Sequence, residues 1–208
     1  MSPYRIAYLR LTKNLKQLQK KFIAQFLPAN PTTLPIQYQL DVQAYCLLAH
    51  AAIEEYVEQV ALALADESIT SWSKGARPNR TLVSLVAFYD EESSIEDDKV
   101  LTTTKCFDRI RHLLKSLHKK YSQDVQDNHG VSVKYLRRIL YPVAIDISDD
   151  PKLQNSLRTL ALERGSYAHK STIKKVLSPE DAATCVQDCQ TICLDIATQA
   201  IALAKTCK

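Results

Sequence analysis

The chain has 208 residues, of which 46% are hydrophobic and 24% are charged, a composition typical of a globular protein with a sizeable core. The formal net charge of +4 is too small to indicate nucleic-acid binding by itself, and no run of about 18 apolar residues predicts a membrane span. Glycine occurs only 3 times, so few positions take a positive φ without strain, which disfavours a turn-rich β-fold.

The N-terminal part of the chain predicts two helices separated by prolines. Over residues 4–26, apolar residues recur at three- and four-residue steps and lysines fill much of the opposite face, as in an amphipathic helix. The second helix, expected over about residues 36–66, is the longest and most apolar of the chain. Residues 68–79 include two strong helix breakers, a glycine and a proline, and are expected to form a loop.

The central part predicts shorter elements with basic faces. A short helix is expected over residues 80–89, followed by an acidic loop over residues 90–98. A helix with a basic exposed side is expected over about residues 99–123, and residues 127–130 are a stop and turn signal. Another short basic helix follows over residues 132–140.

The C-terminal part predicts two more helices. Residues 149–151 combine an aspartate cap with a proline in the first turn, and the helix that they begin is expected to end at Arg164, where Gly165 weakens it. Residues 178–181 predict the start of an alanine-rich helix that continues to about Lys205.

The order of these elements predicts an all-α fold, a bundle of four long helices with short additional helices between them, in a single domain over residues 1–208. The cysteines lie in helical rather than loop contexts, which favours reduced thiols and a cytoplasmic protein, and they are Cys46, Cys106, Cys185, Cys189, Cys193 and Cys207. The N-terminus lacks the apolar core of a secretory signal. No cluster of cysteine and histidine has zinc-like spacing, so we expect no metal site and no cofactor.

One short polar motif stands out against this background. Arg164 and His169 are separated by four residues, and Ala168 directly precedes the histidine. Histidine titrates near neutrality and can move a proton. Arginine carries a fixed positive charge, which can stabilise the negative charge that gathers on the phosphate during RNA cleavage. On either side of a short turn, the two side chains could meet one phosphate. The alternative is an ordinary cation at a helix C-terminus beside an ordinary loop histidine.

This motif resembles the Arg-x4-6-His signature of the HEPN (higher eukaryotes and prokaryotes nucleotide-binding) family, and residues 47–56 resemble the first long helix of that family. The resemblance implies a HEPN-like bundle and a metal-independent endoribonuclease that acts as a homodimer. It also implies attack by the 2′-hydroxyl of RNA, a 2′,3′-cyclic phosphate product, and a toxin–antitoxin or defence setting with an antitoxin or other regulatory protein as partner.

Further residues are assigned to this site. Because the family often has a polar or acidic residue facing the Arg/His pair, Glu54, His50 and Ser166 are expected to support it. His50 and Glu54 are one helical turn apart and can point the same way, although a buried contact that serves only structure explains them equally well. The lysines expected to bind RNA phosphates are Lys170, Lys174 and Lys175.

The sequence also departs from the family pattern. Many members have a polar residue such as asparagine after the arginine, where this chain has Gly165, and some have a tyrosine where this chain has Ser171. A second hypothesis is therefore a non-catalytic helical module that binds a partner protein or a nucleotide. A third is an antitoxin-like partner subunit.

Overall fold

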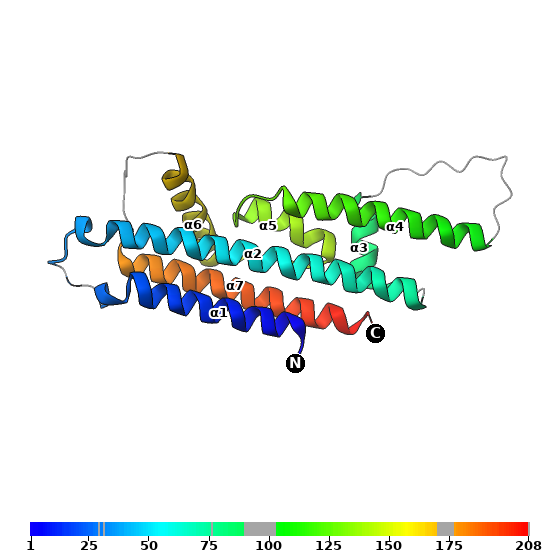
Figure 1. Cartoon of the computed structure of the whole chain (residues 1–208), viewed down its shortest axis with the longest axis horizontal. Coiled ribbons are helices and arrows are strands. Elements are labelled where there is room, and N and C mark those ends of the chain that lie inside the picture. The colour runs from blue at the N-terminus through cyan, green and yellow to red at the C-terminus, as the bar shows by residue number, and fades with distance from the viewer. Residues whose placement is uncertain (29, 31, 76, 90–102, 170–176, 208) are drawn as a thin grey trace.

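The computed structural model describes residues 1–208 except 29, 31, 76, 90–102, 170–176 and 208, and of residues 103–106 and 165–169 it describes the backbone alone. Over these residues the protein is all-α, as expected, and no strand occurs among them (Figure 1). The helices are α1 (Pro3–Phe22), the 3₁₀ helix η1 (Ala24–Phe26), α2 (Pro35–Gly75), α3 (Arg80–Tyr89), α4 (Thr103–Gln126), α5 (Val133–Leu140), the 3₁₀ helix η2 (Tyr141–Val143), α6 (Pro151–His169) and α7 (Pro179–Lys205).

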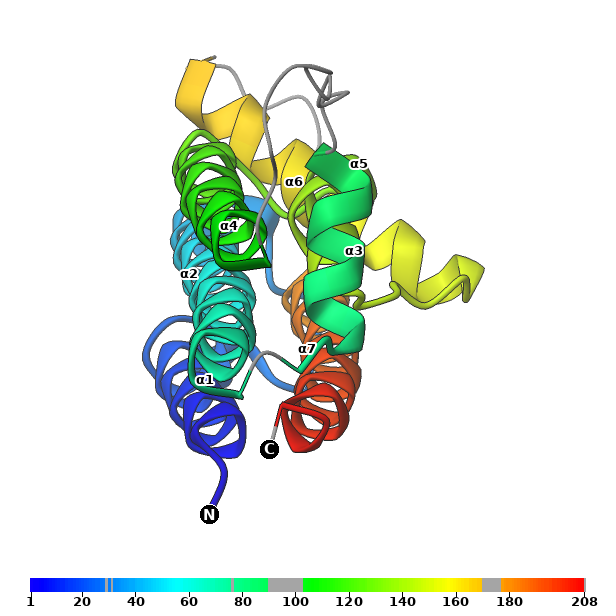
Figure 2. The same ribbon diagram turned by 90° about the vertical axis from the view of Figure 1, so that its right-hand side faces the viewer.

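Helices α1, α2 and α7 run alongside one another and form the body of the bundle (Figures 1 and 2). Helix α6 packs across α2 and α7 near one end of the bundle, while α3, α4 and α5 pack along the other half of α2. The two termini lie at the same end of the molecule. The 41-residue helix α2 is therefore the element that every other α-helix contacts.

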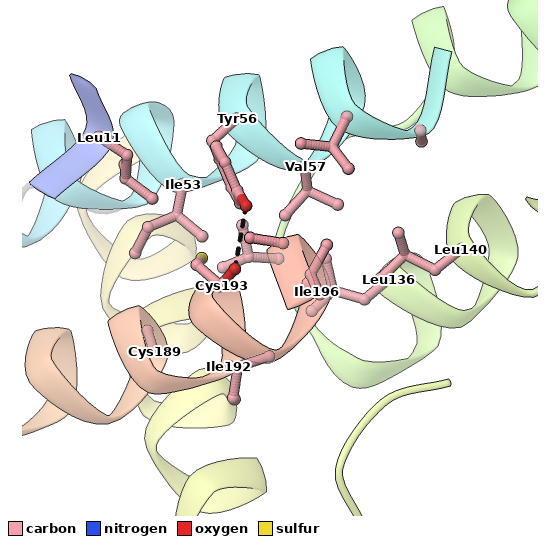
Figure 3. Close-up of a cluster of buried hydrophobic side chains, with 14 of the residues drawn as sticks. Leu11, Ile53, Tyr56, Val57, Leu136, Leu140, Cys189, Ile192, Cys193 and Ile196 are labelled. Carbon is pink, nitrogen blue, oxygen red and sulfur yellow. Dashed lines mark hydrogen bonds between the residues drawn. The ribbon is translucent and has the colours of Figure 1, made fainter. Parts of the chain in front are cut away.

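The main core lies where α1, α2, α5 and α7 meet (Figure 3). Its side chains come from distant parts of the sequence and include Leu11, Ile53, Tyr56, Val57, Leu136, Leu140, Cys189, Ile192, Cys193 and Ile196. The buried hydroxyl of Tyr56 donates a hydrogen bond of 2.9 Å to the carbonyl of Cys193, which satisfies the polar end of an otherwise apolar side chain.

Helix α2 extends beyond the predicted boundary, and the loop expected at residues 68–79 is wrong for most of its length. The hydroxyl of Ser68 is buried and donates to Asn79 Oδ1 at 2.6 Å. Ile69 and Trp72 pack against a second cluster, formed by Leu82, Leu114 and Leu117. These tertiary contacts outweigh the modest helix propensity of the serine- and threonine-containing segment.

The cysteines behave as packing residues. Those whose side chains the structure describes, Cys46, Cys185, Cys189, Cys193 and Cys207, are free thiols. Burial raises the pKa of Cys189 and of Cys193 well above the usual value of a thiol. Such thiols are poor nucleophiles near neutral pH. Separately, none of the helices within the described residues contains a stretch long and apolar enough to cross a membrane.

The start of α7 is fixed by a side-chain cap, which provides a simple stability test. The Ser178 hydroxyl accepts a hydrogen bond of 3.0 Å from the backbone N–H of Asp181. Replacing Ser178 with alanine is expected to lower the free energy of unfolding by about 1 kcal/mol, measured by urea denaturation. Ser132 is a matched control, because it stands at the N-cap of α5 without a side-chain cap bond. An equal loss in Ser132→Ala would contradict the assignment.

Candidate functional site

Arg164 and His169 lie on one continuous helix. The prediction that the helix ends at Arg164 is wrong, because α6 runs through Gly165 and ends at His169. A single glycine costs a helix about 1 kcal/mol relative to alanine, which does not end it when the flanking residues remain helical. The two positions are therefore not on either side of a turn, and they lie about 140° apart around the helix axis at ~100° per residue.

The guanidinium of Arg164 is held between α2 and the segment that joins α4 to α5. Its Nη1 donates a hydrogen bond of 3.0 Å to the main-chain carbonyl of His129. The same nitrogen lies 3.9 Å from Oε1 of Glu54 on α2. The side chain of Arg164 is 35% exposed and that of Glu54 is 16% exposed, so this pair stands at the edge of the core. The cation is thus fixed in place and still reachable from solvent.

His50 stands behind this pair. Its Nδ1 lies 3.7 Å from Oε2 of Glu54, one helical turn further along α2, and the side chain is only 1% exposed. Burial, and then the positive charge of Arg164, lower the pKa of His50 to about 4, so the imidazole is neutral near pH 7. The structure therefore brings His50, Glu54 and Arg164 together. His50 is the buried, uncharged member of this group and contacts Glu54 from the core side.

The buried His50 makes stability depend on pH. The unfolded chain binds a proton at this imidazole near pH 6.5, whereas the folded protein does so near pH 4, so stability is fully present above pH 6.5 and is lost as the pH falls through this window. The contribution approaches about 3 kcal/mol. His50→Gln is expected to flatten this part of the profile in urea unfolding between about pH 7 and about pH 4.5. The exposed His112→Gln serves as control, and an unchanged slope in His50→Gln would contradict the prediction.

The segment between α4 and α5 was not expected at the site. The sequence marked residues 127–130 as a turn signal, and a contact made through a main-chain carbonyl has no side-chain signature. Asn128 is 3% exposed, and its Nδ2 donates to the carbonyl of Gly130 at 3.2 Å. Gly130 has φ +146°, and a Cβ there would lie 3.4 Å from Cδ2 of Tyr135 and 3.7 Å from Nη1 of Arg164. The turn thus needs glycine for its backbone conformation.

Glu58 stands on α2, one helical turn after Glu54, and senses the charges around this turn. Burial, and then repulsion from Glu54, raise the pKa of Glu58 above its usual value, while the side chain of Asn128 and the charge of His129 oppose this shift. The side of α2 that carries His50, Glu54 and Glu58 is therefore lined by ionisable groups at successive turns.

The structure does not describe the side chains of the other residues that the sequence assigned to the site. Ser166 and His169 belong to α6, but their side chains are outside the described residues. Lys170, Lys174 and Lys175 lie outside them entirely. Within the described part of the chain, no group of three or more histidine, cysteine, aspartate or glutamate side chains is placed to hold a metal ion.

Chemically, the described part of the site offers a positioned cation. A guanidinium with one N–H on a carbonyl and a carboxylate nearby retains further N–H groups for an anionic group such as a phosphate. The neutral His50 adds no charge of its own, so the carboxylate of Glu54 is the direct electrostatic partner of Arg164.

Comparison with known protein families gives a match over most of the chain. Residues 8–202 match the model of the family described as RiboL-PSP-HEPN, a range that runs from within α1 to within α7 and contains Glu54, Arg164 and His169. No curated protein and no solved structure matches the chain.

Proposed function

Because the chain belongs to the RiboL-PSP-HEPN family, we propose that it is a metal-independent endoribonuclease whose catalytic residues are Arg164 and His169. The observation that carries this proposal is the placement of Arg164, which is anchored by the His129 carbonyl and Glu54 but remains partly exposed. An arginine that served only to cap a helix or to pair on the surface would not need an anchor on two other segments of the chain.

In the proposed reaction, the 2′-hydroxyl of RNA attacks the adjacent phosphorus and the bond to the 5′-oxygen breaks. Arg164 stabilises the negative charge that gathers on the phosphoryl oxygens, and His169 moves a proton at the reacting oxygens. The products are a 2′,3′-cyclic phosphate and a free 5′-hydroxyl. Lys170, Lys174 and Lys175 lie within six residues after His169 in the sequence and would bind neighbouring phosphates of the substrate.

We further propose that the active form is a homodimer. Two positions about 140° apart on one helix do not converge readily on a single phosphate, whereas helices from two copies can supply an arginine and a histidine to it. A row of exposed apolar side chains lies on the same face of α2 as Glu54, and a second copy of the chain would cover it. Ile36, Leu40 and Leu47 are 74%, 70% and 41% exposed, and helical geometry puts them within about 40° of one another.

The test is cleavage of RNA in the presence of a chelator. The wild-type protein should produce fragments that end in a 2′,3′-cyclic phosphate, while the double variant Arg164→Ala/His169→Ala should not. Arg158→Ala is a matched control, because Arg158 is an exposed arginine on the same helix. Equal cleavage by the wild type and the double variant, or none by the wild type, would contradict the proposal.

A second candidate function uses the same exposed row on α2. A helical module that binds a partner protein, such as an antitoxin or other regulator, would cover Ile36 and Leu40 with a different chain and would not need the Arg/His pair. Light scattering separates the candidates. A dimer that dissociates in Leu40→Asp supports the homodimer, whereas a monomeric wild type without RNA cleavage favours the binding module.

A further inference from the structure

Helix α1 is strongly basic. It contains no aspartate or glutamate, and its six basic residues are all exposed, namely Arg5, Arg10, Lys13, Lys16, Lys20 and Lys21. The whole chain has 27 basic and 23 acidic residues, so the residues outside α1 have a small excess of acidic groups. Within the described part of the chain, no salt bridge joins any of the six to a carboxylate. The excess positive charge of the protein therefore lies on α1.

Three of these lysines form a row along the helix. Lys13, Lys16 and Lys20 lie within about 60° of one another around the axis of α1 and span about 10 Å along it. They line a shallow groove whose other described residues are uncharged, namely Leu9, Thr12 and Gln17. A row of cations beside a groove suits the backbone of a nucleic-acid strand, because successive phosphates present negative charges in a row.

A cavity of about 410 Å³ opens next to this row, between α1 and α7, which run side by side (Figures 1 and 2). Lys16 lines both the groove and the cavity. The buried side chains of the cavity form its floor, and they are Tyr8, Leu15, Tyr45 and Val186. Amide and hydroxyl groups stand nearer the surface, with no carboxylate among the described lining residues, and they belong to Gln19, Gln187, Gln190 and Thr191. The cavity thus combines an apolar floor with polar, uncharged walls and one cation.

Tyr45 leaves a polar group open at this floor. The other described lining residues belong to α1 and α7, so Tyr45, which is 1% exposed, reaches the cavity from α2 with the far end of its side chain. Buried tyrosine hydroxyls usually donate a hydrogen bond, and three in this protein do so, those of Tyr4, Tyr56 and Tyr121. The Tyr45 hydroxyl has no such partner among the described residues. A ligand with a polar edge would supply one.

We propose that α1 and this cavity form a second RNA-binding surface, which holds an unpaired stretch of the substrate. This inference rests on the proposed function. The phosphates lie along Lys13, Lys16 and Lys20, and one base enters the cavity. There the apolar floor packs against the face of the base, and the amide and hydroxyl groups bond to its polar edge. The surface is separate from Arg164, whose partners lie on α2 and on the segment between α4 and α5.

Other anionic partners fit these groups less well. A helix that inserts into an anionic lipid surface needs a free apolar face, whereas α1 buries its apolar face in the core through Tyr4, Leu11 and Leu15. An acidic peptide would pair with the lysines, but its carboxylates would not use the apolar floor of the cavity. A strand of unpaired nucleotides has both a row of charges and flat bases, so it uses both features.

The first experiment tests the lysine row. A labelled single-stranded 2′-O-methyl RNA lacks the attacking hydroxyl and stays uncut, and fluorescence anisotropy measures its Kd at several salt concentrations. Lys13→Gln/Lys16→Gln/Lys20→Gln is expected to raise Kd about 100-fold at about 0.1 M salt and to reduce the slope of log affinity against log salt by about 2. The matched control removes the same charge from exposed lysines elsewhere and should have a much smaller effect, and it is Lys74→Gln/Lys119→Gln/Lys205→Gln.

The second experiment tests the cavity. Ala183→Trp places a large ring at a half-buried lining position of α7 and should weaken RNA binding about 10-fold without changing the salt slope, because no phosphate contact is lost. Tyr45→Phe removes only the hydroxyl and should weaken binding in the same sense. A strand of equal length without bases should bind the wild type and both variants equally. Thr184→Trp is the control, because Thr184 is exposed and does not line the cavity.

The outcomes separate this inference from the proposed function. An unchanged Kd and salt slope in the triple lysine variant, or losses equal to those of its control, would overturn the inference even if the wild type cleaves RNA. Equal binding of RNA and of the base-less strand by the wild type would also overturn it. Tighter binding to phosphatidylserine vesicles than to RNA would assign α1 to a membrane surface instead. RNA binding through α1 without any cleavage would contradict the proposed function and leave the binding surface. Thermal unfolding verifies that each variant is folded.

Discussion

Replacing Arg164 with lysine is expected to slow RNA cleavage about 100-fold, and replacing it with alanine about 1,000-fold. Lysine retains the positive charge but not the planar guanidinium group. The guanidinium of Arg164 donates one N–H to the His129 carbonyl and has further N–H groups for a phosphate, and a single ammonium group cannot reproduce this geometry. The measurement is the single-turnover rate with a defined RNA at saturating protein.

The control for this pair of variants is Arg158→Lys, which exchanges the same side chains at an exposed position of α6 and should leave the rate unchanged. A lysine variant as fast as the wild type would show that charge alone matters at position 164. The contacts of Arg164 with the His129 carbonyl and with Glu54 would then be structural, and the case for a positioned guanidinium would be lost.

The largest effect on stability is expected from the core of the bundle. Ile53→Ala should lower the free energy of unfolding by about 2–5 kcal/mol, because Ile53 is 1% exposed and packs between α2 and its neighbours (Figure 3). Leu48→Ala, on the same helix but 42% exposed, should change it by less than about 0.5 kcal/mol. Urea unfolding followed by circular dichroism measures both.

The shape of the same unfolding curves tests the proposed single domain. One hydrophobic cluster contains residues from α1, α2, α5, α6 and α7, so we expect one cooperative transition that shifts as a whole in Ile53→Ala. Two separated transitions, of which the substitution moved only one, would show that the chain unfolds in independent parts.

The helix ends that were predicted best are those with chemical markers. Ser178 and Pro179 fix the start of α7 through a capping bond and a preset φ, and both lie where the sequence indicated. Asp150 likewise caps α6, since its Oδ1 accepts the backbone N–H of Lys152 at 2.8 Å. Such signals are local, so they can be recognised without knowing what the helix packs against.

The features that were missed depend on tertiary contacts. The last turns of α2 are helical because Ser68 and Trp72 have partners on α3 and α4 or just before them, and no local pattern reveals those partners. The continuation of α6 through Gly165 was missed for a different reason, because one glycine weakens a helix without ending it. Glu54 was placed near Arg164 by its position on a helix that resembles the family, whereas the His129 carbonyl belongs to the main chain and carries no residue-specific signal.

The hydrogen bond from Arg164 to the His129 carbonyl has an entropic consequence. A free arginine side chain loses rotational freedom about several bonds when it binds a ligand, and this loss of conformational entropy weakens binding. In this protein the loss is incurred during folding, when Nη1 docks on the turn. The other N–H groups of the guanidinium are therefore already ordered before an anion arrives. Binding of the anion then costs less conformational entropy, and its affinity is higher.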